Sequence, residues 1–177
     1  LCVSEDFKKS GETKTALDTF YEMEHLKNET PMDFCIRNGW GRYVYEMLVV
    51  DFLILNRDRH GANIEVLRNS REKTLRLAPV FDHGLSLLFS CQTKKAVDEF
   101  DVMQDRQIQC FVGGNSAQKN LELIPKKELP QFHPLKEEHR NELLGGLEGI
   151  VPQYLLDKIW DMIWERWLYY EDFCNQK

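Results

Sequence analysis

Apolar residues recur at intervals of three and four positions over several stretches of this chain, which is the spacing of one face of an α-helix. Thr30 followed by Pro31 is typical of a helix start, because proline fits the first helical position and threonine caps it. The hydrophobic pattern therefore predicts α-helices over residues 15–27, 31–36, 42–55, 136–144 and 152–173.

The stretch at 42–55 is the most hydrophobic of these and leaves little polar face, so we expect a central, buried helix. Two short apolar stretches follow, at 64–67 and 75–80, with a polar turn between them, and this pattern predicts a β-hairpin. Between residues 88 and 134 the pattern is weak, and we expect an irregular segment with one helical turn at 96–103. The sequence thus predicts a mainly α fold with a small β-hairpin.

The composition is that of one ordinary globular domain spanning residues 1–177, with 42% hydrophobic and 29% charged residues. The net charge of -6 argues against binding to nucleic acid or to an anionic membrane surface, because both need clustered positive charge. The chain shows no apolar run of the roughly 18 residues that a membrane span needs and no signal-peptide pattern. A cytoplasmic location is therefore expected.

The cysteines are odd in number, scattered and never arranged as Cys-x-x-Cys, which suits a reducing compartment and gives no zinc-ligand spacing. They are Cys2, Cys35, Cys91, Cys110 and Cys174. Three histidines, His25, His133 and His139, also lack the spacing of metal ligands.

Chemically suggestive residues gather around the predicted hairpin. Asp58 follows the buried helix, Asn63 comes five positions later at the hairpin entry, and Asp82 stands at its exit next to His83 and Gly84. Phosphoryl transfer needs one carboxylate to orient the attacking hydroxyl and oxygen ligands that hold magnesium against the phosphates. The hairpin would let Asn63 and Asp82 reach one magnesium ion and leave Asp58 free as the base. Taken singly, an aspartate at a helix end or an asparagine near a turn is usually a cap, so the spacing of all three carries the hypothesis.

These residues resemble the catalytic lobe of HipA-like serine/threonine kinases. That family carries an Asn-x-Asp-x-His-x-x-Asn motif followed by a Leu-Ala-Pro-x-x-Asp motif. The first is matched by Asn56-Arg57-Asp58-Arg59-His60-Gly61-Ala62-Asn63, and the second by Leu77-Ala78-Pro79-Val80-Phe81-Asp82. The Asp-Arg-His-x-x-Asn core is also similar to that of phosphatidylinositol lipid kinases.

The resemblance implies ATP as substrate and magnesium as cofactor, on a protein-kinase-like C-terminal lobe. It makes Asp58 the catalytic base, Asn63 and Asp82 the magnesium ligands, and His60 a structural or phosphate-facing member of the catalytic loop. His83 either donates to a phosphate or fills its turn. The resemblance further implies a bacterial protein with a protein substrate and an antitoxin-like regulator as partners.

The chain departs from the HipA pattern at Arg57, Arg59 and the His83-Gly84 pair. The two arginines could face phosphate, face carboxylates, or carry solvated charge, and the sequence leaves these alternatives open. Lys94 and Lys95 follow the second motif and could engage an anionic substrate, but two lysines make a thin patch, and solvated charge is the preferred interpretation.

A kinase of this type has an N-terminal lobe with a phosphate-covering loop and a strand lysine. Only 57 residues precede Asp58, and they contain no Gly-rich turn followed by such a lysine. The glycines at 145–149 lie downstream and predict a helix end. We therefore expect a C-terminal lobe that starts near the interlobe hinge, with residues 4–7 bordering adenine, and little activity of this chain alone.

Three functions remain open from the sequence. The first is a HipA-like kinase lobe that phosphorylates protein serine or threonine. The second is a kinase of the same fold that acts on a lipid or small molecule. The third is a pseudokinase or interaction domain that keeps the fold without the chemistry.

Overall fold

The computed structural model describes residues 7–177 and shows a mixed α/β fold. Seven α-helices are formed by these residues: α1 (Leu17–Glu24), α2 (Pro31–Arg37), α3 (Gly41–Leu53), α4 (Lys94–Asp98), α5 (Ala117–Glu122), α6 (His139–Leu144) and α7 (Gln153–Gln176). The strands are β1 (Thr13–Ala16), β2 (Asp58–Arg59), β3 (Glu65–Asn69), β4 (Thr74–Leu77) and β5 (Gln109–Cys110), and two short 3-10 helices are η1 (Gly61–Asn63) and η2 (Lys126–Glu128).

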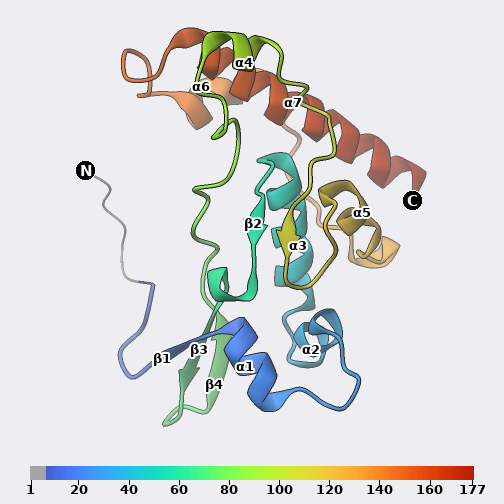
Figure 1. Cartoon of the computed structure of the whole chain (residues 1–177). Helices are drawn as coiled ribbons and strands as arrows, with labels where there is room; N and C mark the ends of the chain where they lie inside the picture. Colours follow the sequence, from blue (N-terminus) through green and yellow to red (C-terminus); the bar gives the residue numbers. More distant parts are fainter. Residues whose placement is uncertain (1–6) are drawn as a thin grey trace.

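Helix α3 is the buried centre of the molecule, as its hydrophobic sequence predicts. Most of its apolar side chains are almost fully buried, among them Val44, Met47, Leu48, Val49 and Phe52. Burying side chains of this size stabilises the fold by roughly 1.5–3 kcal/mol each. Figure 1 shows α3 standing between the three-stranded sheet with α1 at one end and α7 across the other end. The segment that leaves α3 therefore runs through the middle of the molecule.

The predicted hairpin is confirmed as the antiparallel pair β3–β4, in which Val66 faces Leu77 in register. A third strand, β1, extends this sheet by pairing antiparallel with β3. The prediction of one helix over residues 15–27 is wrong at its start, because residues 13–16 form β1 and the helix begins at Leu17. Pairing with β3 is a long-range contact, and it overrides the local helical spacing. The fold is thus more β-rich than the sequence predicted.

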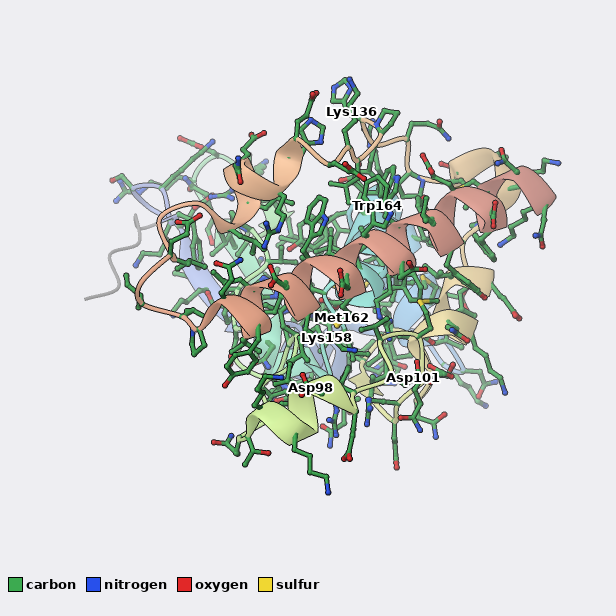
Figure 2. The ribbon with its side chains drawn as sticks, turned by 90° about the horizontal axis from the view of Figure 1, so that it is seen from above. Asp98, Asp101, Lys136, Lys158, Met162 and Trp164 are labelled. Atoms are coloured by element: carbon green, nitrogen blue, oxygen red, sulfur yellow. The ribbon has the colours of Figure 1, made fainter. Side chains whose placement is uncertain are left out.

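Helix α7 is tied to the end of α3 through Arg166. The Arg166 guanidinium donates to the carbonyl oxygens of Phe52 (Nη1, 3.0 Å), Val102 (Nε, 2.8 Å) and Gln104 (Nη2, 3.4 Å). Burial lowers the pKa of Arg166 to about 10, so it stays charged at neutral pH. Viewed from above in Figure 2, α4 with Asp98 lies on one side of α7, and Lys136 lies on the opposite side.

The segment between residues 88 and 134 is more ordered than the weak hydrophobic pattern predicts. Two short helices form there because polar side chains cap them: Thr93 accepts from the amide of Ala96, and Ser116 accepts from the amide of Lys119. The helical turn predicted at 96–103 appears slightly earlier, as α4. The segment also supplies β5, which pairs in parallel with β2.

Two further expectations concern the cysteines and membranes. The described cysteines Cys35, Cys91, Cys110 and Cys174 are free thiols, as their spacing predicts. None of the helices formed by residues 7–177 combines the length and the apolar character that crossing a membrane requires.

Candidate active site

The candidate site is built on a buried ion pair between Arg59 of β2 and Asp51 of α3. Arg59 donates through Nε to Oδ2 and through Nη2 to Oδ1, each at 2.9 Å. The two side chains are only 1% and 7% exposed. Burial opposes the charged form of Arg59, but the hydrogen bonds and charge of Asp51 outweigh it, so the pKa of Arg59 is raised. The pair is therefore charged, and it fixes β2 against α3.

The same guanidinium holds the two predicted motifs together. Arg59 Nη1 donates to the carbonyl oxygens of Asn63 at 3.1 Å and of Phe81 at 2.7 Å. Its Nη2 lies 3.3 Å from Nδ1 of His83. One side chain thus contacts Asn63 directly and both chain neighbours of Asp82. Residues that are more than twenty positions apart in sequence are in this way brought to one buried centre.

Asp58 precedes Arg59 on β2, and its backbone position is fixed from two sides. The Asp58 amide donates to Oδ1 of Asn56 at 3.2 Å, and Asn56 Nδ2 donates to Oδ1 of Asp51 at 2.9 Å. On the other side, the amides of Gln109 and Phe111 donate to the carbonyls on either side of Asp58. The Asp58 side chain is 27% exposed, so it can meet a molecule from solvent.

His60 and Asn63 lie next to Asp58. His60 Nε2 is 3.6 Å from Oδ1 of Asp58, with the imidazole 43% exposed. Asn63 is buried in η1 and donates through Nδ2 to the carbonyl oxygen of Asp58 at 2.9 Å. Because its amide nitrogen is used in this way, the side-chain Oδ1 is the Asn63 atom left to bind a cation.

Asp82 adopts a left-handed backbone conformation with φ of 54° and is exposed. Few residues other than glycine adopt this region, and aspartate and asparagine are among those that do. Within the described part of the chain, no hydrogen bond or ion pair engages the Asp82 carboxylate. The carboxylate is therefore open to a ligand from solvent.

His83 is turned toward Arg59 rather than away from it. A guanidinium can only donate, so Nδ1 of His83 must accept and is unprotonated. Burial and the charge of Arg59 hold the pKa of His83 below its usual value of 6.5. Of the two roles open to His83 from the sequence, this contact favours filling the turn.

Magnesium fits these residues in number and type. Residues 7–177 contain no group of three or more His, Cys, Asp and Glu side chains that could hold a metal by themselves. Magnesium, however, is usually held by one or two protein oxygens, with water and phosphate completing its octahedron. Asn63 Oδ1 and the Asp82 carboxylate are two such oxygens, on segments that Arg59 joins.

The sequence pointed to Asp58, His60, Asn63, Asp82 and His83, but it missed the residues that hold them. The sequence assigns Asp51 no role beyond the hydrophobic helix, gives Asn56 only as the first residue of the motif, and leaves three alternatives open for Arg59. The structure selects the carboxylate-facing alternative for Arg59. The signal that could have found the pair is Asp51 itself, because an aspartate inside such an apolar helix needs a buried partner.

Two other predicted features lie away from this centre. Lys94 and Lys95 pair with Asp98 and Glu99 on the exposed face of α4, in agreement with solvated charge. Of the predicted hinge at residues 4–7, residues 4–6 lie outside the described residues. Phe7 is described, and its ring stacks on Phe81 with centroids 6.3 Å apart.

Comparison with known proteins relates this chain to a protein kinase. It is 26% identical over 163 residues to the serine/threonine-protein kinase CtkA of Helicobacter pylori. The match covers 89% of this chain and 46% of the relative, so the chain spans about half of that protein's length. No family model and no solved structure matches the chain. The relationship supported by the match is that to kinases as a class.

Proposed function

We propose that this chain carries the catalytic loop and the metal-binding segment of a HipA-like kinase, which transfers the γ-phosphoryl group of ATP to a serine or threonine hydroxyl of a protein. The observation that carries the proposal is the convergence on Arg59. One buried guanidinium contacts Asn63 and both neighbours of Asp82, and Asp58 is the adjacent residue in the chain. These are the three positions that phosphoryl transfer needs near one another.

In this proposal Asp58 accepts the proton of the attacking hydroxyl. The carboxylate is partly exposed, so the acceptor can reach it, while the hydrogen bonds on both sides of its backbone limit its movement. General-base catalysis requires approach to about 2.6–3.2 Å, and it typically contributes about 10²–10⁴-fold to the rate. His60, 3.6 Å from Asp58, orients this carboxylate.

Asn63 Oδ1 and the Asp82 carboxylate would hold magnesium and, through it, the ATP phosphates. When bound, magnesium neutralises charge on the transferring phosphoryl group. Arg59 acts as a positioning residue, because it is buried and its contacts run to backbone atoms, Asp51 and His83 rather than to solvent. Its role is to keep Asn63 and the Asp82 segment at a fixed separation.

The test compares Asp58→Asn and Asp82→Asn with the exposed control Asp98→Asn in the complete gene product. Asparagine keeps the shape of each side chain and, at position 82, also tolerates the left-handed backbone. With labelled ATP and a protein acceptor, we expect each site variant to lose at least about 10²-fold in rate and the control to retain activity. Thermal unfolding should be similar for all three variants.

Transfer at the normal rate by both site variants would contradict the proposal. Parallel reactions with protein and lipid acceptors separate it from a lipid kinase of the same fold. A lack of transfer to any acceptor, together with a lack of ATP binding by the folded protein, would favour an interaction domain that keeps the fold without the chemistry.

A further inference from the structure

A small pocket opens at Arg57, the residue before Asp58, between β5 and the segment that follows Asp82. Its volume is about 250 Å³, below the roughly 300–1,000 Å³ of pockets that take drug-sized ligands, so its size suits a single side chain. Its lining consists of Arg57, Leu85, Phe89, Gln107, Ile108 and Gln109.

Two walls of the pocket are fixed by the backbone of Arg57. The Arg57 amide donates to the carbonyl oxygen of Leu85 at 3.1 Å, and the amide of Gln109 donates to the carbonyl oxygen of Arg57 at 3.0 Å. Arg57 also directly precedes Asp58. The pocket is therefore held next to the candidate base, and its position does not depend on the Arg57 side chain.

The Arg57 guanidinium has an aromatic neighbour but no anionic one. Its central carbon lies 5.1 Å from the centroid of the Phe89 ring. Among the described residues, no carboxylate or hydrogen-bond acceptor contacts this guanidinium, although Arg37, Arg59 and Arg76 each bind a carboxylate. A half-buried cation stacked on a ring is a site that a carboxylate can complete, because a guanidinium binds carboxylates through two parallel hydrogen bonds.

The rest of the lining suits a peptide. Leu85 and Phe89 are 41% and 37% exposed, which is high for large apolar side chains that line a pocket. The two glutamine carboxamides can both donate and accept, as a peptide backbone requires. A phosphoryl acceptor must bring its hydroxyl to Asp58, so residues close to this hydroxyl in the acceptor chain come within reach of the neighbouring Arg57.

We propose that this pocket selects the protein substrate by binding an aspartate or glutamate that lies close to the acceptor serine or threonine, with Arg57 taking the carboxylate and Leu85 and Phe89 covering its aliphatic part. This inference rests on the proposed kinase function. The chain as a whole carries a charge of -6 and repels acidic segments, so the preference must come from this local cation.

The test measures binding of fluorescent peptides to the complete gene product by anisotropy. The peptides share one serine and differ in carrying aspartate, alanine or lysine beside it. We expect the aspartate peptide to bind at least about tenfold more tightly than the alanine peptide, with an advantage that shrinks as salt screens the contact. Arg57→Gln should abolish the advantage, and Arg57→Glu should transfer it to the lysine peptide.

Arg71→Gln is the matched control, because Arg71 is exposed on the hairpin turn and its side chain lies outside the pocket. Phe89→Ala should weaken the binding of all three peptides and leave the order of their affinities unchanged. Equal affinity of the three peptides, or an unchanged preference in Arg57→Gln, overturns the inference. The inference is also overturned if vesicles of an anionic phospholipid displace the peptides from wild type but not from Arg57→Gln, since this would assign the pocket to a lipid headgroup.

Anisotropy requires no phosphoryl transfer, so the two proposals can fail separately. Selective binding of the aspartate peptide without its phosphorylation would count against the kinase function. Phosphorylation without charge preference would count only against this role of Arg57.

Discussion

Arg59 and Asp51 form a two-point ion pair in the interior, with both nitrogen–oxygen distances at 2.9 Å. The arginine belongs to the motif that contains Asp58 and Asn63, whereas the aspartate belongs to the helix that forms the core. Removing charges of this kind from water costs free energy, so such a pair is favourable only when every partner is present. The geometry of the candidate site and the stability of the core therefore depend on the same contact.

Asp51→Asn is expected to lower the free energy of unfolding by about 3–5 kcal/mol, because it leaves the Arg59 charge buried without a counterion. Urea denaturation measures this loss. Replacing both partners, as Asp51→Leu with Arg59→Met, should restore much of the stability, since no charge is then buried. Phosphoryl transfer should nevertheless stay impaired in the double variant, because Asn63 and the segment around Asp82 lose their shared donor.

The exposed pair Arg42–Glu46 serves as the control for this prediction, and Arg42→Gln should change stability little. Full activity of the double variant would show that Arg59 does not position the site.

His83 makes stability depend on pH in a defined direction. Its Nδ1 accepts from Arg59 only when unprotonated, and its pKa in the folded protein lies below 6.5. In the unfolded chain the pKa of His83 is about 6.5. Between the folded-state and unfolded-state pKa values the unfolded chain binds more protons than the folded one. The stabilisation by His83 is therefore complete above about pH 6.5 and is lost as the pH falls through the folded-state pKa.

We expect the stability difference between wild type and His83→Gln to shrink as the pH is lowered from about 8 to about 5. Urea denaturation at each pH measures this difference. Protonation of carboxylates at low pH destabilises both proteins alike, so its effect cancels in the difference. A constant difference across the range would mean that His83 does not titrate against Arg59.

Gly61 allows the loop that follows β2 to approach α1. A Cβ atom at this position would lie 2.5 Å from Cβ of Asp18 and 2.9 Å from its amide nitrogen. Because backbone is involved, Gly61→Ala must shift the loop or the helix, and we expect a loss of about 1–3 kcal/mol together with reduced phosphoryl transfer.

Gly41→Ala is the matched control, since the nearest atom to its added Cβ lies at 3.5 Å and the residue opens α3. Alanine favours helix, so this variant should be neutral or more stable by up to about 1 kcal/mol. Thermal unfolding distinguishes the two variants. Equal stability of the two would indicate that the loop can shift to make room for the added Cβ without loss of free energy.

Sequence patterns predicted the elements that bury one continuous apolar face. The helices α3 and α7 and the β3–β4 hairpin were found within a few residues of their bounds, because apolar spacing is a local property. The strand β1 and the two-residue pairing of β2 with β5 were missed, since each depends on a partner more than forty residues away. Such pairings leave almost no local trace in the sequence.

In the candidate site, too, local sequence patterns reveal some residues, whereas contacts between distant residues leave no local pattern. The side-chain chemistry and spacing of Asp58 and Asp82 form a motif, so these two residues could be singled out as candidates from the sequence alone. Asp51 inside an apolar helix indicates that a buried partner exists, but the sequence cannot identify that partner, because the packing of α3 against β2 decides which buried polar groups meet.

The position of Arg59 inside the motif also affects how such motifs are used to recognise enzymes. Because this arginine joins the core helix to the loop, a related chain without phosphoryl transfer would still need it in order to fold. Gly61 would also be needed for folding, because it lets the loop pack closely against α1. The presence of Arg59 and Gly61 in a related chain would thus indicate a shared requirement for folding. The presence of Asp58, which is partly exposed, and of Asp82, which is exposed, would instead support the proposed chemistry.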